Sequence, residues 1–244
     1  MQKVHLAPLW SVLGGAAGLF AVAALNGLSA AGWLAGLFYL GVSNALLTRG
    51  LHRRGTVRFG PANTVTAVRS TLVGLIAALV ITSLTEPVSV MLLVGLAVPA
   101  LVLDAVDGWL ARRTRTATEL GARFDMEVDA FLILVLSVYV SPQLGGWVLA
   151  IGLMRYAYVV AGWMLPWLRT SVPPRYWRKV VAAFAGIALT AVASGLFPVW
   201  VDGAITLVAL GLLIESFGRD VVWQYATAGR TRSGDRDRSL QDSV

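Results

Sequence analysis

The sequence predicts an all-α membrane protein that crosses the bilayer about eight times. Hydrophobic residues make up 57% of the 244-residue chain and charged residues only 14%, whereas soluble domains carry about 25% charged residues. The apolar residues fall into eight runs, and most runs approach the roughly 20 residues that a helix needs to cross the hydrocarbon core. Lys and Arg gather at alternate junctions between the runs. Together these three observations predict a polytopic helical protein.

The apolar runs are separated by charged segments or by segments marked with Pro and Gly. They span approximately residues 7–25, 32–48, 68–84, 89–111, 124–141, 146–166, 180–196 and 203–224. The first run follows Lys3 and so resembles a secretory signal, but it is long for one and lacks a clear cleavage site. We therefore expect it to remain in the protein as a membrane helix.

Basic residues predict the orientation of these helices. Lys and Arg occur near the N-terminus and in segments 49–58, 112–123, 169–179 and 230–238, and the four intervening junctions contain neither. Because Lys and Arg concentrate in cytoplasmic loops, we expect both chain ends in the cytoplasm of a bacterium, with the protein in its plasma membrane. The net charge of +7 then faces anionic lipid headgroups, and no nucleic-acid partner is expected.

Composition divides the chain into three segments. Residues 1–54 hold two N-terminal helices, residues 55–226 hold six more, and residues 227–244 are polar and of mixed charge. The last segment has too few apolar residues to pack, so we expect a disordered cytoplasmic tail. Gly32 and Gly36 allow a close helix approach, which we expect within the chain rather than between two chains.

Four aspartates lie on the fourth and fifth predicted helices. Asp104 and Asp107 share one helix face, and Asp125 and Asp129, four residues apart, share a face of the next helix. The eight polar residues between the helices predict a cytoplasmic turn, which makes the helices antiparallel. All four carboxylates are then expected at a similar depth, just inside the cytoplasmic surface.

Such a group of carboxylates needs a counter-charge. Each isolated carboxylate near the middle of the bilayer costs about 2.5–3.5 kcal/mol. Two divalent cations would neutralise the group, and because the chain has no Cys, oxygen ligands favour Mg²⁺ or Mn²⁺. Two such ions held close together suit phosphoryl transfer, since they bind both the attacking and the leaving oxygen.

Two further roles for these aspartates stay open. They would pair with Arg112, Arg115 and Arg123, or share protons as in a cation- or proton-coupled transporter. Neither role requires Gly108 and Ala111, which lie beside the acids and leave the backbone open to a bulky ligand. Arg112 also offers a bidentate fork for phosphate. We therefore favour a site for a phosphorylated ligand.

At these positions the chain resembles the CDP-alcohol phosphotransferase (CDP-alcohol phosphatidyltransferase) family. The family signature is D-x-x-D-G-x-x-A-R, eight residues, then G-x-x-x-D-x-x-x-D. The chain carries it without a gap, at Asp104, Asp107, Gly108, Ala111, Arg112, Gly121, Asp125 and Asp129. Pro61 to Arg69 is similar to a second segment, P-N-x-x-T-x-x-R, with Ala62 inserted. No signature position has changed, which disfavours a scaffold that has lost catalysis.

The resemblance covers roughly residues 59–225 and implies a six-helix core over 55–226. It implies that Asp104, Asp107 and Asp125 bind one divalent ion, that Asp125 and Asp129 reach a second, and that Asp129 is the general base. It also implies a CDP pocket, lined by Asn63, Thr66, Gly108, Ala111, Arg112 and Gly121. The implied reaction, in phospholipid biosynthesis, is attack by an alcohol on the β-phosphate of a CDP-linked donor, usually CDP-diacylglycerol, with release of CMP. Relatives suggest a homodimer.

The acceptor alcohol is the least defined partner. Arg155 lies well inside an apolar run, where a basic residue is a functional candidate, and its alternative role is an ion pair with Glu127 or Glu215. Relatives that use phosphorylated acceptors are similar in placing an Arg at this helix. We expect glycerol phosphate or inositol phosphate as acceptor, with serine or a second lipid as alternatives. Its expected contacts are Arg155, Arg178, Lys179 and Arg69, of which Arg178 and Lys179 also fit a basic cytoplasmic loop.

Overall fold

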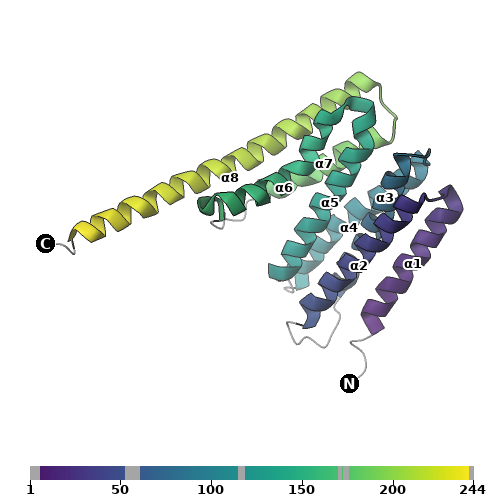
Figure 1. Cartoon of the computed structure of the whole chain (residues 1–244), viewed down its shortest axis with the longest axis horizontal. Coiled ribbons are helices and arrows are strands. Elements are labelled where there is room, and N and C mark those ends of the chain that lie inside the picture. The colour runs from purple at the N-terminus through teal and green to yellow at the C-terminus, as the bar shows by residue number, and fades with distance from the viewer. Residues whose placement is uncertain (1–5, 53–60, 115–118, 170–171, 173–175, 242–244) are drawn as a thin grey trace.

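The described residues of the chain form eight α-helices and two short 3-10 helices and include no strand (Figure 1). The helices are α1 (Leu6–Asn26), α2 (Ala30–His52), α3 (Pro61–Ser83), α4 (Val90–Thr114), α5 (Glu119–Leu144), η1 (Gly146–Val148), α6 (Leu149–Met164), η2 (Pro166–Arg169), α7 (Tyr176–Ala193) and α8 (Val199–Gln241). The computed structural model describes the backbone of residues 6–52, 61–114, 119–169, 172 and 176–241. It describes the side chains of residues 12–46, 64–106, 124–165, 167–168, 172 and 176–228.

Each of the eight predicted apolar runs forms one α-helix, which confirms the predicted all-α membrane class. Four helices of the described chain are long and apolar enough to cross a membrane, and three further apolar helices are shorter. The four spans are Thr64–Ser83, Gly146–Met164, Tyr176–Ala193 and Val199–Ala228. The shorter helices are Val12–Asn26, Ala30–Leu46 and Val90–Val106.

Helix α3 is the centre of the N-terminal half. Every residue from Val73 to Val80 is buried, and α3 packs against α1, α2, α4 and α5. A helix that is apolar on all sides is stable where neighbours surround it. The apolar sequence of α3 therefore explains its central place, and that place lets its polar residues reach both α4 and α5.

Glycines bring α2 close to α3. A Cβ added to Gly32 would lie 2.7 Å from the carbonyl oxygen of Ala78, and a Cβ added to Gly36 would lie 3.1 Å from the Cβ of Ala78. Larger side chains at these two positions would separate the helices. The prediction that Gly32 and Gly36 serve packing within the chain is confirmed.

The junctions without Lys or Arg meet at one end of the helices, toward the upper right of Figure 1. The Ser89 amide donates a hydrogen bond to Asn26 Oδ1 (2.6 Å), which joins the α3–α4 turn to the α1–α2 turn. The Gln143 amide donates to Asp202 Oδ2 (3.1 Å), which joins the end of α5 to the start of α8. Gly27, at φ 76°, allows the chain to reverse after α1. The basic residues predicted that the loops without Lys or Arg lie on one side of the protein, and these contacts agree with that prediction.

The C-terminal half is built on α5 and α7. Helix α7 packs against α4, α5 and α8, and α6 packs against α5 and α8. An ion pair of 3.2 Å between Arg178 and the buried Asp220 ties α7 to α8. Helices α4 and α5, which carry the predicted aspartates, thus contact the same two neighbours, α3 and α7.

The polar C-terminal segment differs from its prediction. We expected disorder over 227–244, but α8 continues as a helix through Gln241. The segment continues a helix that is already formed by the packed part of α8, so it adds one hydrogen bond per residue without the cost of nucleating a new helix. Figure 1 shows this part of α8 running past α6 and away from the other helices.

Candidate active site

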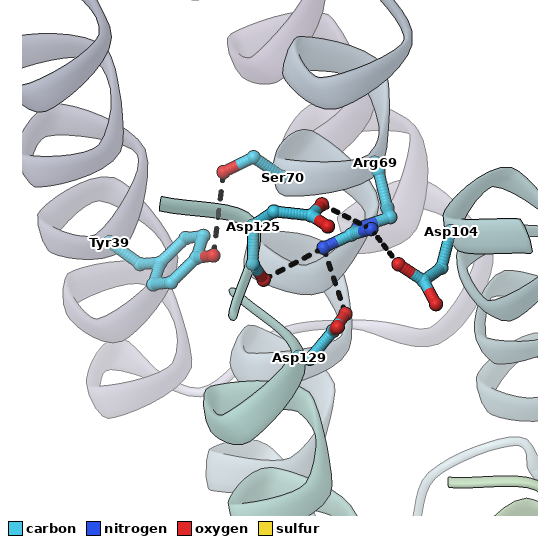
Figure 2. Close-up of polar contacts among 6 residues, drawn as sticks. All are labelled: Tyr39, Arg69, Ser70, Asp104, Asp125 and Asp129. Atoms are coloured by element: carbon cyan, nitrogen blue, oxygen red, sulfur yellow. Dashed lines mark hydrogen bonds and ion pairs between the residues drawn. The ribbon is translucent and has the colours of Figure 1, made fainter. Parts of the chain in front are cut away.

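Arg69, on α3, lies at the centre of a cluster of three aspartates (Figure 2). Its Nη1 forms ion pairs with Asp104 Oδ1 and with Asp125 Oδ1, the latter at 2.7 Å. Its Nη2 lies 2.8 Å from Asp129 Oδ1 and donates a hydrogen bond of 3.1 Å to the backbone oxygen of Asp125. The guanidinium therefore joins α4 to α5. Only 1% of the Arg69 side chain is exposed.

The aspartates converge from two helices, as their spacing predicted. Asp104 lies on α4, Asp125 and Asp129 lie on α5, and one carboxylate oxygen from each falls within 4.8 Å of the others. Their side chains are 31–32% exposed, whereas Arg69 is buried. The carboxylates thus form the more accessible side of the cluster, although Oδ1 of Asp125 is itself buried.

The donor set of this cluster fits a hard divalent cation. All three ligand groups are carboxylates, and oxygen ligands suit Mg²⁺ and Mn²⁺. When ionised, three carboxylates beside one guanidinium leave an excess of two negative charges. The chain itself thus supplies part of the counter-charge, and one divalent cation would balance the remainder.

Several predicted site residues have side chains outside the described part of the chain. These are Asn63, Asp107, Gly108, Ala111, Arg112 and Gly121, whose backbones lie in α3, α4 and α5. Arg115 is outside the described residues, as is the side chain of Arg123, so predicted ion pairs to them are outside as well. Thr66 is half-buried on α3, three residues before Arg69 and therefore on the same helix face.

Helix α2 contributes residues that the sequence analysis missed. The Tyr39 hydroxyl lies 3.4 Å from Ser70 Oγ, and Ser43 forms a second hydrogen bond with Ser70. Ser70 follows Arg69 in α3, and the Tyr39 ring stacks on Phe131 of α5 with ring centroids 4.7 Å apart. Figure 2 shows Tyr39 and Ser70 beside the cluster, on the side away from Asp104.

The predicted acceptor residues fall into different surroundings. Arg155 forms an ion pair with Glu127, which was one of its two expected structural partners. Arg178 forms an ion pair with Asp220 of α8. Lys179 lies near enough to Asp129 to interact with it electrostatically. The structure therefore brings Arg69 into contact with the aspartates and gives Arg155 and Arg178 acidic partners of their own.

Comparison with known proteins identifies the family of this chain. The model of the CDP-alcohol phosphatidyltransferase family matches residues 59–214. No curated protein and no solved structure shows a significant match. The family match covers more than half of the chain, including α3 to α7 and the first part of α8, whereas α1 and α2 precede it. The chain belongs to the CDP-alcohol phosphatidyltransferase family.

Proposed function

We propose that this protein transfers a phosphatidyl group from CDP-diacylglycerol to an alcohol and releases CMP. Members of its family are transferases of substituted phosphate groups that use CDP-linked alcohols. The observation that carries the proposal is the convergence of Asp104, Asp125 and Asp129, all signature residues, around one buried guanidinium. The family match gives no support to the transporter interpretation.

We propose that Asp104, Asp107, Asp125 and Asp129 bind two Mg²⁺ or Mn²⁺ ions. The carboxylate donor set supports divalent cations here, the two excess negative charges of the described cluster match one of the two ions, and Asp107 would add a fourth carboxylate toward the second. When bound, such ions polarise phosphoryl oxygens and stabilise the charge that develops during displacement. Arg69 would hold the three described carboxylates in place from their buried side, which leaves their exposed side to the ligands.

In the proposed reaction the acceptor hydroxyl oxygen attacks the β-phosphorus of the donor. The new phosphorus–oxygen bond forms as the bond from the β-phosphorus to the oxygen bridging to CMP breaks. The hydroxyl proton passes to Asp129, which acts as general base, and CMP leaves with the bridging oxygen. Lys179, which interacts electrostatically with Asp129, would add positive charge to the site. A positioned general base contributes about 10²–10⁴-fold to a rate.

We propose that the CDP moiety lies beside the small residues of the signature. Their lack of bulky side chains would let a nucleotide approach the backbone, and Thr66, Asn63 and Arg112 would supply polar contacts. The helical register supports this arrangement, because Gly108 and Ala111 follow Asp104 by four and seven residues along one face of α4.

For the acceptor we propose a phosphorylated polyol, glycerol phosphate or inositol phosphate. Arg155 supports this choice: although it pairs with Glu127, its buried Nε has no hydrogen-bond partner among the described residues. Arg178 and Lys179 complete the proposed acceptor contacts, whereas Arg69 is buried and paired with three aspartates and would act on the acceptor only through them. An anionic acceptor needs such positive charge, whereas serine does not.

The chain is an integral membrane protein by its apolar helices and its family. We propose that it lies in a bacterial plasma membrane with the aspartates toward the cytoplasm, as its basic loops indicate. There the lipid tails stay in the bilayer while the nucleotide stays in water. We further propose that residues 55–226 form the catalytic core, that residues 1–54 add two helices to it, and that the protein is a homodimer.

The direct test is a transfer assay with purified protein, labelled CDP-diacylglycerol and Mg²⁺. The acceptor panel contains glycerol phosphate, inositol phosphate, serine and a phospholipid, and both CMP and the lipid product are measured. We expect acceptor-dependent CMP release that is fastest with one phosphorylated polyol. Absence of CMP release with every acceptor, together with cation flux in proteoliposomes that contain no CDP-lipid, would contradict the proposal and favour a transporter.

A further inference from the structure

A cavity of about 800 Å³ lies between α2, α3 and α5, with Tyr156 of α6 completing its lining. Apolar side chains form most of its wall, which is typical of sites for apolar ligands, and its volume lies within the usual range for such sites, about 300–1,000 Å³. Helix α2 contributes a full side of the cavity, from Ala35 to Leu46. This side precedes the family-matched region, which begins at residue 59.

The α5 segment that lines the cavity runs from Phe124 to Val138. It contributes Phe124, Val128, Phe131, Leu134, Val135 and Val138 together with one charged residue, Glu127. At 1.5 Å per residue it extends about 21 Å along the helix axis, whereas half of the hydrocarbon core is about 15 Å thick. The cavity is therefore long enough for the acyl chain of a lipid that belongs to one leaflet.

One end of the cavity adjoins the aspartate cluster. Phe124 and Val128 of the lining directly precede Asp125 and Asp129 in α5. Tyr39, also in the lining, hydrogen-bonds through its hydroxyl to Ser70, the neighbour of Arg69. Figure 2 shows the Tyr39 side chain on the α2 side of the cluster. A molecule in the cavity would therefore have its polar end at the carboxylates.

We propose that the cavity holds an acyl chain of the CDP-diacylglycerol donor, and that α2 sets the chain length that the enzyme accepts. This inference rests on the proposed function, because it places the donor's diphosphate at the aspartates. An ordinary membrane phospholipid would fill the same apolar space, but it has no diphosphate to reach the cluster. The donor is therefore the ligand that fits both parts of the site, with its acyl chain in the cavity and its diphosphate at the aspartates.

Filling the deep end of the cavity tests this inference. Ala35→Trp would occupy the end opposite Leu46. The control is Leu34→Trp, at the preceding residue of the same helix, which alters a side chain that is 70% exposed and outside the lining. Transfer is measured with dioctanoyl and dipalmitoyl CDP-diacylglycerol.

We expect Ala35→Trp to lower kcat/KM for the dipalmitoyl donor about tenfold, roughly the effect of losing the burial of two methylene groups. Its dioctanoyl value and both Leu34→Trp values should stay close to those of the unaltered protein. An equal loss for both donors in Ala35→Trp would overturn the inference.

A photocrosslinking experiment separates this inference from the proposed function. CDP-diacylglycerol with a diazirine near the end of one acyl chain is bound to the full-length protein, and the labelled peptides are identified by mass spectrometry. Labelling of the cavity side of α2 or α5 that unlabelled CDP-diacylglycerol prevents would support the inference, whatever the rate of CMP release. Absence of CMP release would then count against the proposed function alone. Labelling elsewhere, or equal competition by phosphatidylcholine, would overturn the inference.

Discussion

At the scale of single residues, the buried Arg69 contacts more groups of the site than any other described residue does. Removing a guanidinium from water is costly, and a buried ion pair is retained only where good geometry and hydrogen bonds compensate. Arg69 meets this condition with three carboxylates and one backbone oxygen. The same contacts hold three acidic groups together that would otherwise repel one another.

Arg69→Ala should therefore destabilise the protein. We expect the free energy of unfolding to fall by about 3 kcal/mol, the low end for breaking a buried ion pair, because the aspartates are partly exposed. Thermal unfolding in detergent with EDTA measures the effect. Added Mg²⁺ should restore part of the stability, since a bound cation would replace the lost positive charge.

A double variant provides the matched control for Arg69→Ala. Asp104→Asn removes one negative charge, so Arg69→Ala combined with Asp104→Asn should be less destabilised than additivity of the single changes predicts. Strictly additive effects would show that Arg69 contributes by packing and not by charge.

Asp129→Asn should lower kcat for phosphatidyl transfer by about 10²–10⁴-fold, because an amide cannot take the acceptor proton. Single-turnover CMP release measures this rate. Asp202→Asn is the control, since Asp202 is a buried carboxylate on α8 whose partner Gln143 lies at the opposite end of α5 from Asp129. Equal losses in both variants would contradict the assignment of Asp129.

At the scale of elements, the approach of α2 to α3 holds the Tyr39 side of the site in place. Gly32→Leu should destabilise the protein by about 1–3 kcal/mol, because its Cβ would meet the carbonyl oxygen of Ala78. Gly41→Leu is the control on the same helix. A Cβ added at Gly41 would have no atom within 4 Å, so this substitution should leave stability nearly unchanged. Thermal unfolding of both variants in detergent compares them, and similar melting temperatures would contradict this account of the packing.

The ion pair between α7 and α8 distinguishes two roles of Arg178. Arg178→Ala leaves the buried carboxylate of Asp220 without its ionic partner, so we expect a loss of about 3 kcal/mol in stability. Arg178→Ala combined with Asp220→Asn should recover much of it. The KM for the acceptor provides the second measurement. A KM that stays raised in the stable double variant would show that Arg178 also binds the acceptor, whereas a normal KM would assign it a structural role.

At the scale of the whole molecule, hydropathy and charge predicted the helical architecture. Every apolar run formed a helix because a long apolar segment in a bilayer must satisfy its backbone hydrogen bonds internally. Junctions free of Lys and Arg were predicted at one end, and the Asn26 to Ser89 and Gln143 to Asp202 contacts agree. Helix α8 extends further than predicted, because apolar content measures packing and not the local hydrogen bonding of a helix.

The site was predicted only in part. The spacing of Asp104, Asp125 and Asp129 was enough to predict their convergence, because helical periodicity fixes which residues share a face. The place of Arg69 depends on which helix packs between α4 and α5, and spacing within one helix does not determine that. A signal was nevertheless present, since Arg69 is the one charged residue in the apolar run 68–84. The α2 side of the cavity had no comparable signal, because most of its lining residues are apolar and such residues are equally expected on a helix that faces lipid.

The central claim is that divalent cations at the Arg69-centred carboxylates support phosphatidyl transfer. The most direct test measures CMP release from CDP-diacylglycerol by the purified protein, with the best acceptor, over a range of free Mg²⁺ and in EDTA. We expect release to stop in EDTA, to return with Mg²⁺ or Mn²⁺, and to be absent in a folded Asp125→Asn variant at every Mg²⁺ concentration. Undiminished release in EDTA, or normal release by Asp125→Asn, would contradict the claim.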